Sequence, residues 1–180
     1  MRDIELRGIF IQSFVLACKN LNVLASESVA EILAARADSW VPAERFTTLF
    51  HSLEARFRDF EPIKERLGME MMRLWHVLGP GRSIVSTGVD FLRFQTGSEG
   101  YLSVVRGPAA TVGAFTLDHL DVSAGRARVK STTPFDHTME RGVLLGGMRL
   151  AGDLVYVDAR NEPVDVRSEE NPSVYELTFH

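Results

Sequence analysis

Asp136, His137 and Glu140 lie close together near the start of a predicted C-terminal helix, where His137 and Glu140 would share one face. A histidine and two carboxylates could begin a metal site. A structural zinc site, however, usually takes about four ligands, most of them Cys and His. Acidic residues are also favoured at a helix N-terminus by the helix dipole. We therefore interpret this group as a helix start and expect no metal ion.

The other candidates for chemistry are single residues or weak motifs. Cys18 lies in an apolar run, so its thiol is expected to be buried and inert. His119 alternates with Phe115 and Leu117 on one strand face, which favours a place at the edge of the core over a role as a base. The turn at 79–83, GPGRS, lacks the Gly-Lys-Ser/Thr ending of a phosphate-binding loop and is interpreted as the end of a helix. No sequence-local cluster has the spacing that catalysis needs.

The composition is that of one ordinary folded domain. The chain has 180 residues, of which 45% are hydrophobic and 24% charged, enough for a single core. A net charge of -4 argues against nucleic-acid binding, which needs a basic stripe. A single cysteine can form no internal disulfide, so we expect a reducing, cytoplasmic location. The apolar run at 8–18 is too short to span a membrane and fits a signal peptide poorly.

The first half of the chain predicts helices. Residues 9–21 are apolar nearly all round, which is typical of a helix enclosed by others. A capping-box pattern at Ser28 predicts a short helix to about Ala37, and Pro42 is placed in the first turn of the next helix. Residues 83–95 suit a helix or an irregular strand, and we favour the helix. Apolar side chains recur at helical spacing in two further stripes: Phe46, Leu49, Phe50, Leu53 and Phe57, then Ile63, Leu67, Met71, Leu74 and Leu78.

After Gly100 the pattern changes from helix to strand. The predicted strands are 101–105, a hairpin of 112–121 with 126–130, then 154–157, and a last strand with Tyr175, Leu177 and Phe179 inward. A helix over 136–151, ended by Gly152, interrupts them, and a loop spans 160–173. Glycines 142, 146 and 147 on that helix favour close backbone packing, or alternatively room for a ligand.

Helices first and strands later indicate an α+β fold. We predict a single domain over 1–180, in which a helical N-terminal half (4–95) packs on a small, mainly antiparallel C-terminal sheet with one helix (100–180).

The C-terminal half also resembles a known superfamily. The stretch TPFDHTMERGVLLGGMRLAGDLVYV, with VYELTF after a loop, is similar to the end of the superfamily of 4-vinyl-reductase-like domains, haem nitric-oxide-binding domains and small TRAPP transport subunits. The whole layout, with RGIFIQSFV near the start and LGPGR midway, resembles a set of paralogous myxobacterial proteins of unknown function. The resemblance implies a ligand-binding or scaffolding domain, often regulatory and often dimeric.

This resemblance raises haem as a candidate cofactor, because the haem-binding members use a helix histidine and a Tyr-x-Ser-x-Arg strand that holds the propionates. Here His76 lies on a predicted helix, and Tyr101 and Ser103 are followed by Arg106, one residue late. In a strand Arg106 would point to the opposite face from Tyr101 and Ser103 unless a bulge restored the parity. The C-terminal half has no cysteine for zinc. We expect no haem, no metal and no other cofactor.

The sequence favours a binding module over an enzyme. Our first hypothesis is a non-catalytic sensory or regulatory module that binds a small apolar ligand or a protein partner. The second is a protein-binding scaffold subunit with a filled core, and the third an enzyme of unknown reaction. We expect no nucleic-acid partner and no membrane span. Inward positions of the predicted elements give the expected pocket lining: Phe10, Phe14, Phe46, Phe50, Leu74, Val143 and Phe179.

The first predicted helix carries apolar side chains on more than one face. A helix packed on one side needs a single apolar stripe, so the surplus must be covered by another helix or by a second copy. We expect a homodimer built partly from N-terminal helices. The two sets are Phe10, Phe14 and Leu21 on one face, and Ile11, Val15 and Cys18 toward another.

Overall fold

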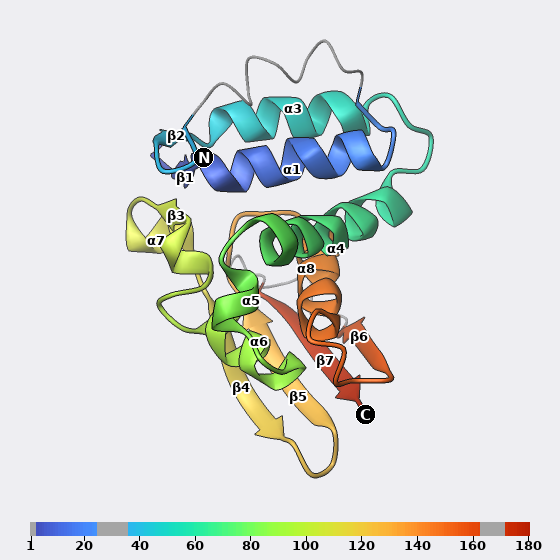
Figure 1. The fold of residues 1–180 in the computed structure, drawn as a ribbon. Coiled ribbons are helices and arrows are strands. Elements are labelled where there is room, and N and C mark those ends of the chain that lie inside the picture. The colour runs from blue at the N-terminus through green and yellow to red at the C-terminus, as the bar shows by residue number, and fades with distance from the viewer. Residues whose placement is uncertain (1–2, 25–35, 163–171) are drawn as a thin grey trace.

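The computed structural model describes residues 3–24, 36–162 and 172–180. Its helices come first in the chain and its larger sheet last, which confirms the predicted α+β class. Figure 1 shows α1 and α3 side by side above the rest of the molecule, where α4, α6 and α8 lie over the sheet. The helices are α1 (Gly8–Asn20), α3 (Glu44–Glu54), α4 (Glu61–Leu78), α5 (Gly81–Ile84), α6 (Gly88–Thr96), the 3₁₀-helix η2 (Tyr101–Ser103), α7 (Ala109–Val112) and α8 (His137–Arg149).

Two antiparallel sheets hold the described strands. The larger has the order β4-β5-β7-β6, and its β4–β5 hairpin turns at Gly125, where φ is +63°, as the sequence predicted. The smaller has the order β2-β1-β3. The strands are β1 (Glu5–Arg7), β2 (Trp40–Pro42), β3 (Val105–Arg106), β4 (Phe115–Asp121), β5 (Arg126–Ser131), β6 (Val157–Asn161) and β7 (Ser173–Phe179).

The small sheet was not predicted and corrects the all-helical reading of residues 4–95. Leu6 pairs with Val41 on one side and with Val105 on the other. Pro42 therefore lies in β2, an edge strand that tolerates proline, and α3 begins at Glu44. The strand predicted over 101–105 is wrong for most of its length, because η2 occupies residues 101–103.

Several predicted boundaries also shift. α3 ends at Glu54, so Phe57 lies beyond the helix, where its ring stacks on Phe60 at 5.5 Å. Leu78 is 71% exposed and leaves the apolar stripe of α4 at the last residue of that helix. The strand predicted at 154–157 instead begins at residue 157, after an almost fully exposed Val155. Residues 28–35 of the helix predicted at 28–37 lie outside the described residues. Residues 163–171 of the loop predicted at 160–173 also lie outside them.

A β-bulge overturns the prediction for His119. Leu117 pairs with Val129 and His119 with Arg128, so Asp118 is the extra residue between them. An extra residue reverses the alternation of side chains along a strand. His119 is therefore exposed rather than at the edge of the core, although Phe115 is buried as expected.

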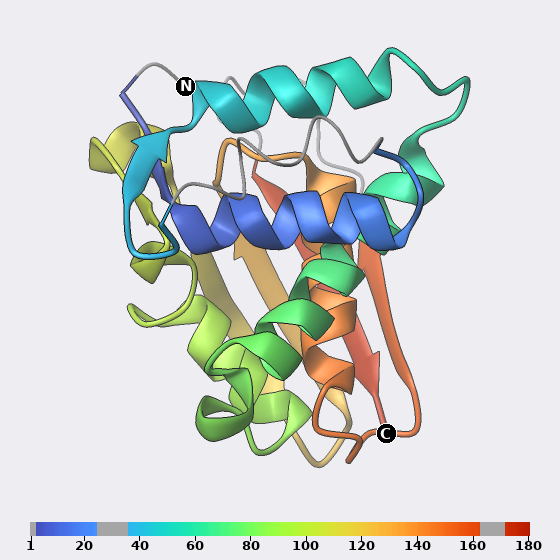
Figure 2. The same cartoon turned by 45° about the horizontal axis from the view of Figure 1, so that its top comes forward.

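Helix α1 is buried within its own chain. Phe14, Val15, Ala17 and Cys18 have no exposed surface, because α3 lies along one side of α1 and α4 along another (Figure 2). The apolar surplus that led us to expect a second copy is thus covered by helices of the same chain. The homodimer stays a prediction, now without that support.

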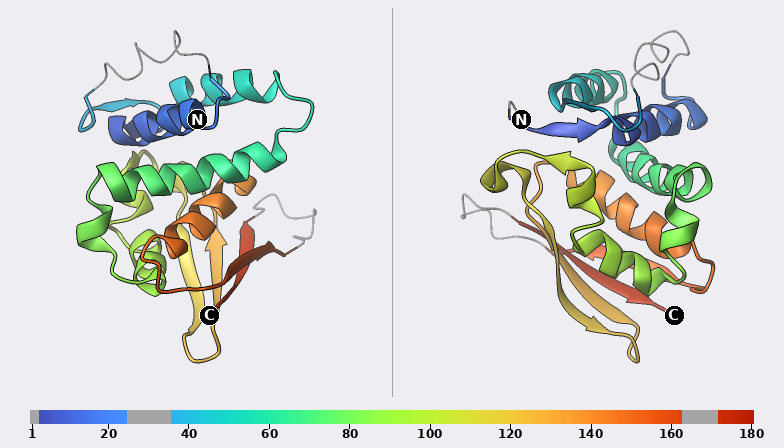
Figure 3. Two further views of the ribbon diagram at one scale, coloured as in Figure 1. Left: turned by 45° about the vertical axis from the view of Figure 1, so that its right-hand side comes forward. Right: turned by 60° about the vertical axis from the view of Figure 1, so that its left-hand side comes forward.

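Helix α8 lies between α4 and the larger sheet (Figure 3). A Cβ atom at Gly142 would overlap the carbonyl of Glu65, and one at Gly68 would overlap the carbonyl of Met139. Glycine at these positions allows the two helix backbones to touch, in agreement with the close packing predicted from the glycines of α8. Asp136 caps α8 by accepting a hydrogen bond from the Met139 amide at 3.0 Å. This cap confirms the interpretation of Asp136 as part of a helix start.

Candidate functional site

A cavity of about 100 Å³ lies where α1, α4, α6 and α8 meet η2. Its wall is mostly apolar, with six aromatic and three methionine side chains. The aromatic residues are Phe10, Trp75, Phe94, Tyr101, Phe115 and Phe135, the methionines are Met71, Met72 and Met139, and the aliphatic residues are Ile9, Val104 and Val143. Ser13, Gln95, Gly100, Ser103 and Glu140 complete the lining.

The aromatic rings of the wall are packed against one another. Trp75 of α4 stacks on Phe94 of α6 with ring centroids 5.1 Å apart. On the opposite side Phe10 and Phe135 lie 5.5 Å apart, and Phe135 meets Tyr101 edge-on at 6.1 Å. Such offset and edge contacts fix the ring orientations. The cavity therefore has rigid walls that present aromatic surface.

The structure brings two of the predicted pocket residues to this cavity, Phe10 and Val143. Phe14, Phe46 and Phe50 form an adjacent aromatic cluster between α1 and α3, with Phe14 and Phe46 only 4.8 Å apart. This cluster reaches the cavity wall through Phe46, which contacts Phe10 at 5.5 Å.

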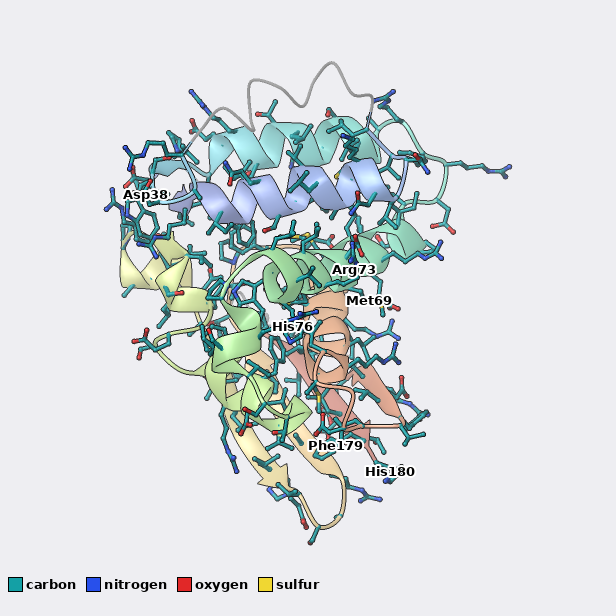
Figure 4. All side chains as sticks on the ribbon, viewed as in Figure 1. Asp38, Met69, Arg73, His76, Phe179 and His180 are labelled. Atoms are coloured by element: carbon teal, nitrogen blue, oxygen red, sulfur yellow. The ribbon has the colours of Figure 1, made fainter. Side chains whose placement is uncertain are left out.

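The remaining two predicted pocket residues lie elsewhere. Leu74 is buried on α4 but is not part of the cavity wall. Phe179 is buried at the end of β7, close to the C-terminus and away from the helices that form the cavity (Figure 4). Leu74 was predicted from helical spacing and Phe179 from strand alternation. Such patterns predict that a side chain is buried, but not which other buried side chains it contacts.

Glu140 is the one acidic side chain that the described residues contribute to the cavity wall, and it is only 4% exposed. The Tyr175 hydroxyl donates a hydrogen bond to Glu140 Oε2 at 2.8 Å, and the Thr133 hydroxyl donates to Oε1. His137 Nδ1 lies 3.5 Å from Oε2, and its hydrogen bond with Glu140 raises the pKa of His137. Burial raises the pKa of Tyr175, and the nearby carboxylate adds to the effect.

No cation from elsewhere in the described residues reaches this carboxylate. Lys64 is buried close by, but its ammonium group binds three other carboxylates, those of Glu54, Glu61 and Asp136, at 2.8, 2.7 and 3.0 Å. In the part of the chain that the structure describes, His137 is the only basic group within 4 Å of Glu140. Those residues also contain no group of three His, Cys, Asp or Glu placed to hold a metal ion.

Sequence reasoning placed Glu140 at a helix terminus and missed its burial. One signal was available, because Glu140, Leu144 and Met148 recur at i, i+4 and i+8 and therefore share one helix face. A carboxylate in phase with two buried apolar residues predicts a buried acid. Its partner Thr133 lies just after β5, and its partner Tyr175 lies in β7. Only folding brings these two side chains together at Glu140.

The residues considered for haem do not assemble into a site. Tyr101 and Ser103 line the cavity, but from a 3₁₀-helix rather than a strand. Arg106 faces outward on β3, where it pairs with Glu5 at 2.7 Å and lies over the Trp40 ring at 4.4 Å. His76 lies near the C-terminal end of α4 and outside the cavity wall (Figure 4).

The cavity itself does not fit a haem. Among the described residues, its lining includes no histidine, cysteine, lysine or arginine. Methionine and tyrosine can ligate haem iron, but the Tyr101 hydroxyl donates to the Val112 carbonyl at 2.6 Å. A volume of about 100 Å³ is also well below the roughly 300–1,000 Å³ of typical cofactor pockets. Aromatic side chains fill the interior instead.

Two further features carry less weight. A hollow of about 370 Å³ between α4 and α8 is lined by Arg66, Arg73 and Arg149, but Arg73 pairs with Glu70 and Arg149 binds the Val157 carbonyl. Cys18 is buried as predicted, and burial raises the pKa of its thiol to about 12. A thiol of this kind is inert at neutral pH.

The fold is similar to that of solved H-NOX domains. An oxygen-binding H-NOX domain related to soluble guanylate cyclases matches with a TM-score of 0.73 at 10% identity, over 97% of this chain and 95% of that one. An H-NOX structure solved to study H-NOX activation matches with a TM-score of 0.68 at 11% identity, over 97% of this chain and 96% of that one. An unliganded Fe(II) H-NOX variant from K. algicida matches with a TM-score of 0.63 at 11% identity, over 97% of both chains.

These similarities establish the fold and agree with the haem nitric-oxide-binding branch of the predicted resemblance. No protein-family model matches the chain, and no curated protein matches it in sequence. No helix among the described residues is long and apolar enough to cross a membrane.

Proposed function

We propose that this protein is a non-catalytic sensory module that binds a small, largely apolar ligand in the cavity between α1, α4, α6 and α8. The observation that carries the proposal is the cavity itself, with its rigid aromatic wall and few polar groups. Ligand sites in proteins are typically concave and apolar with a small number of placed polar groups. The similarity in fold to an oxygen-binding H-NOX domain supports the binding of a small ligand.

The size of the cavity limits the ligand. An engineered apolar cavity of roughly 150 Å³ admits benzene or xenon, and the cavity here is about 100 Å³. A ligand of about four to six heavy atoms therefore fits without repacking the wall. A macrocyclic cofactor or a long acyl chain does not.

The position of the cavity suits a sensor. Ile9 and Phe10 of α1 form one side, and Met139 and Val143 of α8 form another, so a ligand touches both the N-terminal helices and the part of the fold that carries the larger sheet. A ligand shifts a protein between two states only if it binds one of them better. Occupancy of this cavity would favour one spacing of α1 from α8.

Methyl NMR under xenon pressure tests the proposal. Met71, Met72 and Met139 line the cavity, whereas Met148 is fully buried outside its wall and serves as an internal control. With methyl-labelled methionine, we expect saturable shifts of the three cavity methyls and a constant Met148 signal. Unchanged cavity methyls would contradict the proposal and favour the scaffold with a filled core.

A further inference from the structure

The polar group of the cavity points to a more specific ligand. We propose that the cavity selects a small alkylated ammonium ion, such as trimethylammonium, over a neutral molecule of the same shape. This inference rests on the proposed function and adds the charge and chemical class of the ligand. It is carried by the juxtaposition of the buried Glu140 carboxylate with a wall of aromatic rings.

The Glu140 carboxylate has capacity for a further donor. Thr133, Tyr175 and His137 occupy up to three of the roughly four acceptor positions that a carboxylate offers. Glu140 is also part of the cavity wall, so a ligand in the cavity lies beside this side chain. An alkylated ammonium with a single N–H needs only one such acceptor.

The charge of the site favours a cation. A buried charge is costly unless it is paired, and in the described part of the chain no lysine or arginine belongs to this cavity wall. The neighbouring phenols stay neutral, because burial and Glu140 raise the pKa of Tyr101 and Tyr175, and a phenol cannot supply a positive charge. The basic group found within 4 Å of Glu140 among the described residues, His137, is 46% exposed, so solvent screens its charge. A cationic ligand in the cavity would complete the pairing of the carboxylate.

The aromatic wall decides between kinds of cation. Ring faces attract cations whose centre lies within about 6 Å, and alkylated ammonium ions are the usual ligands of aromatic cages. Trp75 and Phe94 form one side of the wall and Phe10 and Phe135 another. The alkyl groups would pack against these rings and the methionine side chains. A hard metal ion would instead need about six oxygen ligands, and the wall does not supply them.

A comparison of isosteric ligands tests the inference. Trimethylammonium and isobutane have the same shape and differ in charge, and both can be titrated against the cavity methyls of Met71, Met72 and Met139. We expect both to bind there, with the cation binding more tightly by about tenfold or more, since hydrogen bonds to charged groups are the stronger ones.

Variants identify the source of the preference. Glu140→Gln should weaken the binding of trimethylammonium by about tenfold or more, because it keeps the shape of the side chain and removes its charge. The affinity for isobutane should stay within about twofold of the wild-type value. The matched control is Glu70→Gln on α4. Glu70 lies outside this cavity, so its substitution should change the affinity for neither ligand. Phe94→Leu should weaken the binding of the cation more than the binding of isobutane, because it removes a ring face and keeps apolar surface.

The wild-type protein offers a second readout that needs no variant. His137 faces Glu140 and Asp136, and its pKa is held up first by the hydrogen bond with Glu140. A cation bound to Glu140 competes with protonated His137, so trimethylammonium should lower the His137 pKa measured by NMR. Isobutane should leave that pKa unchanged.

The outcomes separate the two proposals. Equal or weaker binding of trimethylammonium than of isobutane, or unchanged cation affinity in Glu140→Gln, would overturn the ammonium inference and leave a cavity for neutral ligands. Failure of xenon, isobutane and trimethylammonium alike to shift the cavity methyls would overturn the proposed function as well. A His137 pKa that trimethylammonium leaves unchanged would also count against the inference.

Discussion

At the scale of residues, the main feature is Glu140, an acidic side chain in a mostly apolar cavity wall. Glu140 is held by hydroxyl groups from two other segments, Thr133 after β5 and Tyr175 in β7. Its remaining contact, His137, is half-exposed, and the hydrogen bond with Glu140 raises the pKa of His137 above its usual value. The charge on Glu140 is thereby linked to solvent through a single histidine.

Substitution of His137 by glutamine should remove part of the pH dependence of stability. The folded-state pKa of His137 is raised by Glu140, so its stabilising contribution is complete below the unfolded-state pKa of about 6.5. That contribution is lost as pH rises through the folded-state pKa. Because the side chain is 46% exposed, solvent screening limits it to less than about 1 kcal/mol.

Urea denaturation at several pH values measures this effect. The free energy of unfolding of the wild type relative to His137→Gln should be largest at acidic pH and should shrink as the pH rises above about 6.5. The same substitution at His119, which is exposed, is the control. A constant difference between wild type and His137→Gln over this range would show that the contact with Glu140 does not contribute.

At the scale of elements, aromatic and charged contacts join the N-terminal helices to the rest of the fold. Phe50 of α3 packs against Phe14, Phe46 and Phe60, and the Lys64 ammonium lies 5.8 Å from the Phe50 ring. Lys64 of α4 also binds carboxylates from α3, α4 and the cap of α8. These contacts hold α1 and α3 above α4 and α8.

Truncation of Phe50 to alanine should lower the free energy of unfolding by about 3–5 kcal/mol, because it leaves a cavity among tightly packed rings. Val155→Ala is the matched control, since Val155 is 99% exposed and should change stability by less than about 0.5 kcal/mol. Chemical denaturation of both variants measures the difference. Equal stability of the two would mean that the α1–α3 cluster is not part of the core.

Removal of the Lys64 charge should also destabilise the fold. Lys64→Met leaves Asp136 and two glutamates without their shared cation, and the Lys64 side chain is only 6% exposed. Loss of one partner of a buried pair costs about 3–5 kcal/mol, and exposure of the glutamates reduces this to about 1–3 kcal/mol. The control is Lys19→Met on the exposed end of α1. An equally stable Lys64→Met would contradict the structural role of this cluster.

The elements with a clear apolar period could be predicted from the sequence, and the small sheet and the β-bulge could not. Periodicity and turn residues predict α1, α3, α4, α8, the β4–β5 hairpin and β7. β1 and β2 have only three residues each, too few to show a strand period. The bulge at Asp118 reverses alternation without a glycine or proline to mark it. The site was only partly predictable, because it depends on which buried faces meet.

At the scale of the whole molecule, the chain combines an H-NOX-like fold with an interior that does not fit haem. The fold similarity extends over 97% of the chain, although sequence identity to the H-NOX structures is only 9–12%. Aromatic side chains occupy the interior and leave about 100 Å³ between α1, α4, α6 and α8. A site for a small molecule at the junction of these helices is therefore the central claim.

Diffraction from xenon-pressurised crystals tests this claim most directly. Apolar cavities of this size class take up xenon, which anomalous scattering locates without any assumption about the natural ligand. We predict a strong anomalous peak in contact with Met71, Phe94 and Met139, inside the cavity wall. Absence of xenon from this position, with side chains packed into the space, would contradict the claim and make the protein a solid scaffold.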